Sequence, residues 1–392
     1  MITEFTFLVW YLGLTVPLYW LIPARLVGMR QGFLGLVSAA VLWMLSPFIL
    51  IVVCGFALLL AGFALAAKRG VSRAGLKKLS WAVFAPLLLV EIFPTDLLIS
   101  GMLGPRAVEM AGLRGFAMLG LSYTAIRCFI MCRECLDGKP PSPLLAALTF
   151  LFFGSFVAGP ITGSGPYRAA AQKLELENLL TGLARIGWGA AVFLVLRRAV
   201  IDADLIGWAN VLPGGVAATW IETYHAFAVL YLDFAGYTEI AIGAALMFGI
   251  RLPDNFRYPF LARSMQEFWQ RWHLSLGAFI GTYLFKPLVR NYGKPTLAIF
   301  LAFVLVGLWH RFSIPYFIWG IGHGGMLAWE MARRKKLAQS PPSLWRISRV
   351  GVAVRGGMGW AFTMTYVAVL STFATREDFG TALDYLGRLF GL

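Results

Sequence analysis

The chain has 392 residues, of which 59% are hydrophobic and only 14% are charged, and its mean hydropathy is +0.73. Since an ordinary soluble domain carries about 25% charged residues, this composition excludes a water-soluble globular protein and indicates a polytopic membrane protein. The formal net charge of +15 would suggest nucleic-acid binding in a soluble protein, so the placement of this charge decides its meaning.

The first apolar segment, 5–22, has no basic region before it and no small-residue cleavage site after it, so we expect a retained span rather than a signal peptide. A helix needs about 20 residues to cross a bilayer. Apolar runs near this length lie at 5–22, 32–46, 48–67, 81–99, 116–131, 143–162, 179–196, 205–232, 314–329 and 356–374.

Two short basic stretches carry most of the excess positive charge. Residues 68–78 contain five Lys or Arg and residues 331–355 contain seven, and neither stretch contains an acidic residue. Both adjoin apolar segments, as loops retained on the cytoplasmic side do. We therefore expect both in the cytoplasm and no nucleic acid as a partner. Binding of membrane lipid or of an acidic carrier protein is the alternative use of this charge.

The four cysteines do not have the spacing of a disulfide framework. Cys54 lies in an apolar run, and Cys128, Cys132 and Cys135 stand at helical spacing. A metal site would need closer pairing together with His or acidic partners, so we expect a thiol-bearing helix end and no bound metal.

Three apolar runs are shorter than a usual span: 236–250, 276–289 and 297–309. With both basic stretches in the cytoplasm, the number of spans between them must be even, yet nine apolar runs lie within 81–329. At least one is therefore expected to re-enter the membrane or lie flat, beside a cavity around 250–310 that satisfies its irregular backbone. No linker or repeat interrupts the chain, which favours a single membrane domain over 1–392.

His225 lies in apolar sequence shared with two carboxylates, Asp233 and Glu239. Buried carboxylates need partners, and Arg251, Arg257 or Arg271 could supply them. The two acids are six residues apart and so lie on different faces of a helix, which argues against a paired acid/base site.

The segment 264–276 has the pattern of one amphipathic helix. Its apolar face carries Met265, Phe268, Trp272 and Leu276, with Trp269 at the edge. Glu267 and Arg271, four residues apart, are expected to form an ion pair on the side away from His273. His273 would offer an imidazole to a cavity; the alternative is that it hydrogen-bonds a neighbouring carbonyl and orders a bend.

His310 ends the apolar run "TLAIFLAFVLVGLWH", beside Arg311 and shortly before Pro315. Imidazole exchanges protons near neutral pH, so a histidine placed here is a candidate general base. His323 follows in "WGIGHGG", where Gly320, Gly322, Gly324 and Gly325 would let another backbone approach closely. The alternative for His323 is a role in helix packing.

No Walker, Rossmann, zinc-protease or Gly-x-Ser-x-Gly pattern occurs in the sequence. The polar groups within the apolar segments are His, Trp, Tyr, Asn255 and a few acids. This set suits transfer of an activated acyl group to a hydroxyl, in which a histidine removes the hydroxyl proton as the oxygen attacks.

Several blocks resemble the membrane-bound O-acyltransferase family, most closely within 229–330. "LDFAGY", "DNF" and "FWQRWH" resemble the family's Asp-Phe-Ala/Ser-Gly-Tyr, Asn-Phe and Phe-Trp-x-Arg-Trp-His blocks. "GLWHR" resembles the Gly-Leu-Trp-His-Gly block that carries its catalytic histidine. "WGIGHGG" is similar to its Trp-Gly-x-x-His-Gly segment, and "FVAGPI" to its Ala/Ser-Gly-Pro-Ile turn.

The resemblance implies that His310 is the catalytic histidine and His273 the second polar member of the site. The expected substrate and tunnel lining is Trp269, Trp272, Trp309, Asn255, Arg311, His323 and Asp233. It further implies an all-α polytopic membrane protein with about eleven transmembrane helices, and short re-entrant or interfacial helices around a central tunnel. No tightly bound cofactor is expected. The family's usual Arg-Asp pair is replaced by Gly281 and Thr282, and a Gly by Arg311, which bears on donor docking or acceptor choice.

The activity implied by the resemblance starts from a cytoplasmic acyl thioester, either acetyl-CoA or an acyl carrier protein. The acyl group crosses the bacterial cytoplasmic (inner) membrane to hydroxyls of an extracytoplasmic polysaccharide or to a partner transferase. Acetylation of an exopolysaccharide is favoured, and D-alanyl transfer to a teichoic-acid-like polymer is the alternative. A proton-coupled transporter is the alternative of another class, although such proteins show two related halves and the polar residues here crowd into 233–330. An inactive scaffold is a further alternative.

Overall fold

The structure is a computed structural model that describes residues 2–45, 47–84, 111–156, 158–168, 174–202, 215–339, 348–376 and 378–392. These residues are mostly helical and contain no strand, which confirms the expected all-α fold. Among them, four helical segments are long and apolar enough to cross a membrane: Val27–Met44, Leu50–Lys68, Leu176–Ile201 and Val216–Met247. The count of about eleven spans stays a prediction.

The chain forms two compact units, 1–194 with 234–253 and 195–233 with 254–392, and helix α15 (Val216–Met247) contributes residues to both. We call them unit 1 and unit 2. The single domain over 1–392 stays a prediction.

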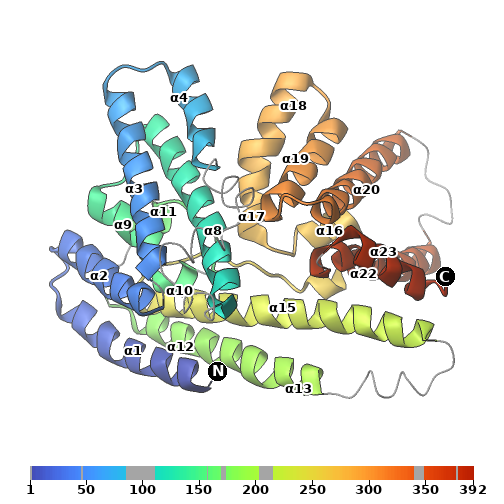
Figure 1. The fold of residues 1–392 in the computed structure, drawn as a ribbon, viewed down its shortest axis with the longest axis horizontal. Helices are drawn as coiled ribbons and strands as arrows, with labels where there is room; N and C mark the ends of the chain where they lie inside the picture. Colours follow the sequence, from blue (N-terminus) through green and yellow to red (C-terminus); the bar gives the residue numbers. More distant parts are fainter. Residues whose placement is uncertain are drawn as a thin grey trace. The chain divides into compact units, whose positions relative to one another are not determined.

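Unit 1 packs helices around an aromatic core. Its helices are α1 (Ile2–Leu21), α2 (Val27–Leu45), α3 (Pro47–Lys68), α4 (Arg73–Leu79), η1 (Ser80–Phe84), α8 (Ala111–Leu136), α9 (Pro143–Leu151), α10 (Phe153–Phe156), α11 (Gly165–Arg168) and α12 (Leu176–Ala190), drawn from blue to green in Figure 1. In the core, the rings of Tyr19 and Phe152 each meet Phe248 edge to face, at 5.3 and 6.4 Å between centroids. Such contacts add to the stabilisation that burial of the rings provides.

Helix α12 lies alongside the part of α15 that belongs to unit 1 (Figure 1), with the two backbones almost touching. A Cβ atom at Gly182 would lie 2.8 Å from the carbonyl oxygen of Gly243, and one at Gly189 would lie 2.6 Å from that of Gly236. Only glycine leaves room for this approach. Beyond α12 the chain continues as a π-helical segment (Ala191–Leu196) and α13 (Arg197–Asp202).

Unit 2 contains His273 and His310, each of which follows a tryptophan in the sequence. Its elements are α13, the first part of α15, η3 (Pro259–Leu261), α16 (Met265–Trp269), α17 (Leu274–Phe279), η4 (Ile280–Phe285), α18 (Lys286–Tyr292), α19 (Pro295–His310), α20 (Ile314–Ala338), α22 (Arg349–Thr375) and α23 (Phe379–Leu389). Figure 1 shows α19 and α20 side by side. Both have a proline in the first turn, where the missing N–H costs no helical hydrogen bond.

Two expectations about the apolar runs are wrong. The run 236–250 is not a separate short element, because α15 continues through it without a break to Met247. The run 143–162 is not one helix, because α9 ends at Leu151 and the backbone of Phe152 leaves the helical conformation, with φ −53° and ψ 103°. Most of 81–99, part of 205–232 and residues 340–347 of the second basic stretch lie outside the described residues. All four cysteines are described, and each is free in the structure.

Candidate active site

Close packing of α19 against α20 brings His310 and His323 into one cluster. A Cβ atom at Gly320 would lie 2.7 Å from the carbonyl oxygen of Phe303, and one at Gly324 would lie 2.8 Å from that of Phe300. The ring of Trp319 contacts both imidazoles, at centroid distances of 5.5 Å to His310 and 4.4 Å to His323.

The expected close approach at the four glycines is therefore confirmed at Gly320 and Gly324. At Gly322 a Cβ atom would instead meet the side chain of Leu370 on α22, at 2.7 Å. At Gly325 nothing lies within 4 Å, so the expectation is wrong there.

A loop over residues 255–275, here called the 255–275 loop, carries α16 and His273. Backbone hydrogen bonds close its neck, from Arg257 N to Arg271 O at 2.9 Å and from Leu274 N to Asn255 O at 3.0 Å. Inside the loop, the hydroxyl of Ser264 caps α16 by accepting a hydrogen bond from Glu267 N at 3.2 Å. Hydrogen bonds within the 255–275 loop thus define its backbone conformation.

The carboxylate of Glu330 attaches α16 to α20. It accepts hydrogen bonds from Met265 N at 2.8 Å and from Gln266 N at 3.0 Å, which satisfy two backbone donors in the first turn of α16. An anion at a helix N-terminus is also favoured by the helix dipole. Sequence reasoning missed Glu330, although it is the one acidic residue between Glu267 and Glu377.

The prediction of one helix over 264–276 is wrong. Helix α16 ends at Trp269, and α17 begins at Leu274 after His273 adopts a left-handed conformation with φ 44° and ψ 58°. The physical reason is competition for backbone donors. Asn255 takes the N–H of Leu274 on its carbonyl oxygen and the N–H of Ser275 on Oδ1, at 3.2 Å, so these donors do not continue α16.

Asn255 therefore holds the backbone on one side of His273. Its Oδ1 also accepts a hydrogen bond from the Ser275 hydroxyl at 2.6 Å. Because Ser275 N–H can only donate, the amide oxygen must face it, which fixes the orientation of the side chain. Asn255 is 1% exposed, and its Nδ2 has no hydrogen-bond partner among the described residues. A buried amide N–H therefore remains available next to His273.

Trp269 fixes the orientation of His323. Its indole N–H donates to Nδ1 of His323 at 3.2 Å, and the two rings meet edge to face at 5.3 Å. Since an indole N–H can only donate, Nδ1 must be the unprotonated nitrogen and the neutral ring carries its proton on Nε2. The ring of Phe303 stacks on that of His323, with 6.4 Å between the centroids, and also meets Trp269.

His310 differs from the other two histidines in its exposure. His273 and His323 are 3% and 2% exposed, whereas the side chain of His310 at the end of α19 is exposed. His310 is close enough to both to interact with each electrostatically. The rings of Trp309 and Tyr316 flank it, at 4.6 and 5.8 Å. Unit 2 therefore brings three imidazoles together, and His310 is the most exposed of the three residues.

Comparison with known proteins supports the resemblance. The family model for membrane-bound O-acyltransferases matches residues 134–369. The chain belongs to the membrane-bound O-acyltransferase family. The matched range includes every candidate site residue named from the sequence, and membership confirms that the chain is a membrane protein.

Curated relatives from several bacteria cover parts of the chain. A probable alginate O-acetylase of Pseudomonas fluorescens is 30% identical over 304 residues, which are 72% of this chain and 57% of the relative. A peptidoglycan O-acetyltransferase of Helicobacter pylori is 29% identical over 275 residues, 65% of this chain and 49% of the relative. A teichoic acid D-alanyltransferase of Bacillus subtilis is 30% identical over 229 residues, 54% of this chain and 58% of the relative. The chain spans about half the length of the curated relatives it matches.

The other candidate residues of this family member lie in four different environments. Trp272 packs into an aromatic group, stacked on Phe268 at 5.4 Å and edge to face with Phe256 at 5.1 Å. Arg311, the residue that follows α19, has an extended backbone and is exposed. Asp233 is paired with Arg197 rather than with a histidine. Gly281 and Thr282 lie in the π-helical segment η4, with open space where a side chain at Gly281 would stand.

The expected partners of Asp233 and Glu239, which are both half-buried, are wrong. Glu239 pairs with Arg185 at 3.1 Å, because the close approach of α12 to α15 places this arginine beside it. Arg197 pairs with Asp233, while Arg251 pairs with Glu175 at 3.1 Å. The acids Asp233 and Glu239 thus have separate partners, and His225 hydrogen-bonds the carbonyl oxygen of Val200 at 2.9 Å.

Proposed function

We propose that this chain is a bacterial cytoplasmic-membrane O-acyltransferase that moves an acyl group, in the first instance acetyl, from a cytoplasmic thioester to an extracytoplasmic polymer. The donor is acetyl-CoA or an acyl carrier protein. The acceptor is a polysaccharide hydroxyl, reached directly or through a partner transferase. The observation that carries the proposal is the accessible imidazole of His310 beside the buried His273 and His323, in a chain of this family.

In the proposed reaction His310 is the general base. It takes the proton of the acceptor hydroxyl as that oxygen attacks the carbonyl carbon of the thioester. A C–O bond forms, the C–S bond breaks, and His310 returns the proton to the leaving thiolate. An ester and a free thiol result, so no oxidant or reductant is needed.

In this proposal the two buried histidines, His273 and His323, are held in fixed positions beside His310. Trp269 holds His323 in one tautomer, and Asn255 holds the backbone next to His273. His273→Ala is expected to slow turnover more than it lowers the thermal stability of the protein. An unfolded His273→Ala protein would instead favour the alternative in which this residue only orders the bend.

D-alanyl transfer to a teichoic-acid-like polymer is the second candidate. It is favoured by the similarity to the D-alanyltransferase of Bacillus subtilis, at 30% identity. Both candidates use the same base and differ in the acyl group and the acceptor. Membership of an acyltransferase family gives no support to the alternative of a proton-coupled transporter.

The test is mass analysis of surface glycopolymers from cells with the gene, without it, and with a His310→Ala copy. A polysaccharide that loses acetyl esters in the last two strains supports the proposal. Loss of D-alanyl esters selects the second candidate. Unchanged glycopolymers in all three strains contradict both.

A further inference from the structure

The imidazole of His323 has one nitrogen that is free to act on a substrate. Its Nδ1 accepts the indole N–H of Trp269 at 3.2 Å. An indole N–H can only donate, so Nδ1 holds a lone pair and the proton of the neutral ring is on Nε2. An imidazolium ring donates from both nitrogens and would not accept this hydrogen bond. His323 therefore offers one N–H donor and no free lone pair.

The Nε2–H group of His323 has no partner within the part of the chain that the structure describes. The two ring nitrogens point in nearly opposite directions, so Nε2–H faces away from Trp269. Nε2 is also not fully enclosed, because it is not one of the described polar atoms that lack both a partner and exposed surface. Since burial of a donor without an acceptor is destabilising, we expect a substrate atom to supply the acceptor.

Aromatic rings hold the imidazole of His323 in place. Trp319 lies 4.4 Å away between centroids, Phe303 stacks at 6.4 Å, and Trp269 meets the ring edge to face at 5.3 Å. The close approach of α19 and α20 at Gly324, the next residue, fixes the backbone. A donor that is held in this way needs no reorganisation when charge develops beside it.

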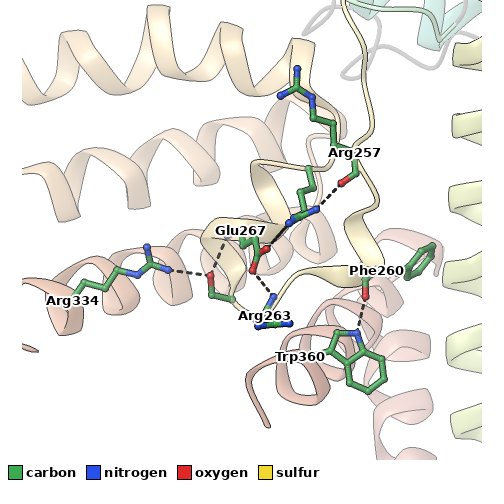
Figure 2. A network of polar contacts seen from close by, with 8 residues as sticks. Arg257, Phe260, Arg263, Glu267, Arg334 and Trp360 are labelled. Carbon is green, nitrogen blue, oxygen red and sulfur yellow. Dashed lines mark hydrogen bonds and ion pairs between the residues drawn. The ribbon is translucent and has the colours of Figure 1, made fainter. Parts of the chain in front are cut away.

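Polar contacts around Glu267 fix helix α16, which carries Trp269 (Figure 2). Oε1 of Glu267 accepts hydrogen bonds from Nη2 and Nε of Arg271, at 2.7 and 3.1 Å. The expected ion pair between Glu267 and Arg271 is thus confirmed. Arg334 of α20 donates to the hydroxyl of Ser264 at 3.1 Å. These contacts connect α16 to α20 and so direct the indole N–H of Trp269 at Nδ1 of His323.

His310 has the properties that His323 lacks. Its side chain is exposed, and neither of its ring nitrogens has a hydrogen-bond partner among the described residues. The ring of Trp319 contacts both imidazoles, which are close enough to interact electrostatically. When His310 takes a proton, a second imidazolium ring beside it would be repelled, whereas a neutral His323 is not. His310 can accept a proton, and His323 can only donate a hydrogen bond.

We propose that His323 is a catalytic residue whose Nε2–H donates a hydrogen bond to the carbonyl oxygen of the acyl thioester. This inference rests on the proposed function. As the acceptor oxygen attacks the carbonyl carbon, the π electrons move onto the carbonyl oxygen, and Nε2–H stabilises that negative charge. The C=O bond then forms again while the C–S bond breaks and its electron pair leaves on sulfur. His310 carries the transferred proton, and His323 keeps its own throughout.

The first test is the kcat of acyl transfer by the purified full chain with the donor that the wild type uses, acetyl-CoA or an acetylated carrier protein. His323→Phe keeps a planar ring but has no N–H. We expect kcat to fall about 100-fold to 1,000-fold, as loss of one oxyanion donor does, with the KM for the donor and the melting temperature unchanged. His323→Gln has an amide N–H near the position of Nε2 and should keep kcat within about tenfold of the wild type.

His225→Phe is the matched control, because it makes the same replacement at a half-buried histidine that bonds to the carbonyl oxygen of Val200. Its kcat should equal that of the wild type. If His323→Phe does not fold, His323→Leu takes its place in the comparison. A folded His323→Phe or His323→Leu protein with wild-type kcat would overturn the proposal, and so would a loss in folded His323→Gln as large as theirs.

The pH profile of kcat distinguishes a hydrogen-bond donor from a base. His323→Phe should lower kcat by the same factor at every pH, since His323 does not exchange its proton during the reaction. Loss of the rise of kcat with pH in this variant would make His323 the base and overturn the proposal.

A double-mutant cycle tests whether Trp269 acts through His323. If it does, Trp269→Phe should lower kcat by less than about twofold in the His323→Phe background, although it lowers kcat much more in the wild type. Equal factors in both backgrounds would contradict the assignment of the Nε2 proton by Trp269.

Calorimetric binding of two coenzyme A ketones separates this inference from the proposed function. The trifluoroacetonyl thioether hydrates to a tetrahedral centre, whereas the acetonyl thioether stays a ketone. The wild type should bind the first at least about tenfold more tightly, and His323→Phe should bind both equally. The same preference in both proteins would overturn the role of His323 and leave the acyltransferase intact. A preference that depends on His323, without acyl transfer by the wild type, would contradict the proposed function alone.

Discussion

The indole N–H of Trp269 donates a hydrogen bond to Nδ1 of His323, and this contact joins the 255–275 loop to the helix that follows His310. It assigns the proton of the neutral His323 ring to Nε2. It also places Trp269 against Phe303 and Trp319, at 4.7 and 5.9 Å, inside the cluster that His310 borders. A residue that the sequence suggested only as tunnel lining therefore positions a histidine.

Replacement of Trp269 by Phe should lower the kcat of acyl transfer about tenfold. Phenylalanine keeps most of the ring packing but leaves Nδ1 of His323 without its donor, a loss of about 1 kcal/mol for a neutral hydrogen bond. The measurement is kcat with the melting temperature alongside. Trp272→Phe is the control, because its ring packs on Phe268 and Phe256. Equal kcat losses in both variants would argue against a specific role for the Trp269 N–H.

Two substitutions at Asn255 separate its two functions. Asn255→Asp keeps an acceptor for Ser275 N and replaces the free amide N–H by an oxygen. Asn255→Ala removes both. We expect the alanine variant to lose about 1–3 kcal/mol of unfolding free energy, because it leaves buried donors unsatisfied. The aspartate variant should fold better than the alanine variant and still lose activity. An aspartate variant with wild-type kcat and KM would show that the free N–H has no part in the reaction.

Glu330→Gln should lower the unfolding free energy by about 1–2 kcal/mol. Glutamine offers one acceptor in place of the carboxylate that receives the N–H groups of Met265 and Gln266, and it removes the charge at the start of α16. Thermal unfolding measures the change. Glu175→Gln, which breaks a largely exposed ion pair with Arg251, is the control and should cost less than about 1 kcal/mol. Equal losses of unfolding free energy in both variants would show that the hydrogen bonds from Met265 and Gln266 to Glu330 add no more stability than an exposed ion pair.

Adjacent glycines in α20 should respond in opposite directions. A Cβ atom at Gly324 would lie 2.8 Å from the backbone carbonyl oxygen of Phe300, whereas nothing lies within 4 Å of one at Gly325. We expect Gly324→Ala to destabilise the protein by about 1–3 kcal/mol through overpacking. Gly325→Ala should be neutral or stabilising by up to about 1 kcal/mol, since alanine is the better helix former. Melting temperatures that fall equally would contradict the close packing of α19 and α20.

Sequence reasoning succeeded where the interacting residues are close along the chain. The ion pair of Glu267 with Arg271 follows from a spacing of four residues, and the apolar runs gave the helical membrane fold. It failed where the partner is distant. Helix 264–276 is broken because Asn255 takes the donors of Leu274 and Ser275, nearly twenty residues away in the chain.

The ion pairs of Asp233 and Glu239 show the same limit. Glu239 contacts Arg185, 54 positions before it, because glycines let α12 approach α15. The spacing of residues near Glu239 in the sequence does not predict this contact. The histidines could be named from the sequence, since ionisable residues in apolar segments are uncommon. The structure was needed to show that His310 is more exposed than His273 and His323.

In the proposed reaction, acyl transfer depends on His310 as the general base. The most direct measurement is transfer of labelled acetyl from acetyl-CoA to a polysaccharide hydroxyl by the purified wild type and by His310→Ala, with coenzyme A binding and thermal unfolding recorded for both. We expect kcat to fall roughly 100-fold to 10,000-fold in His310→Ala, the range that general bases contribute, with coenzyme A binding and melting temperature unchanged. Transfer by His310→Ala at a rate near that of the wild type would show that His310 is not the general base.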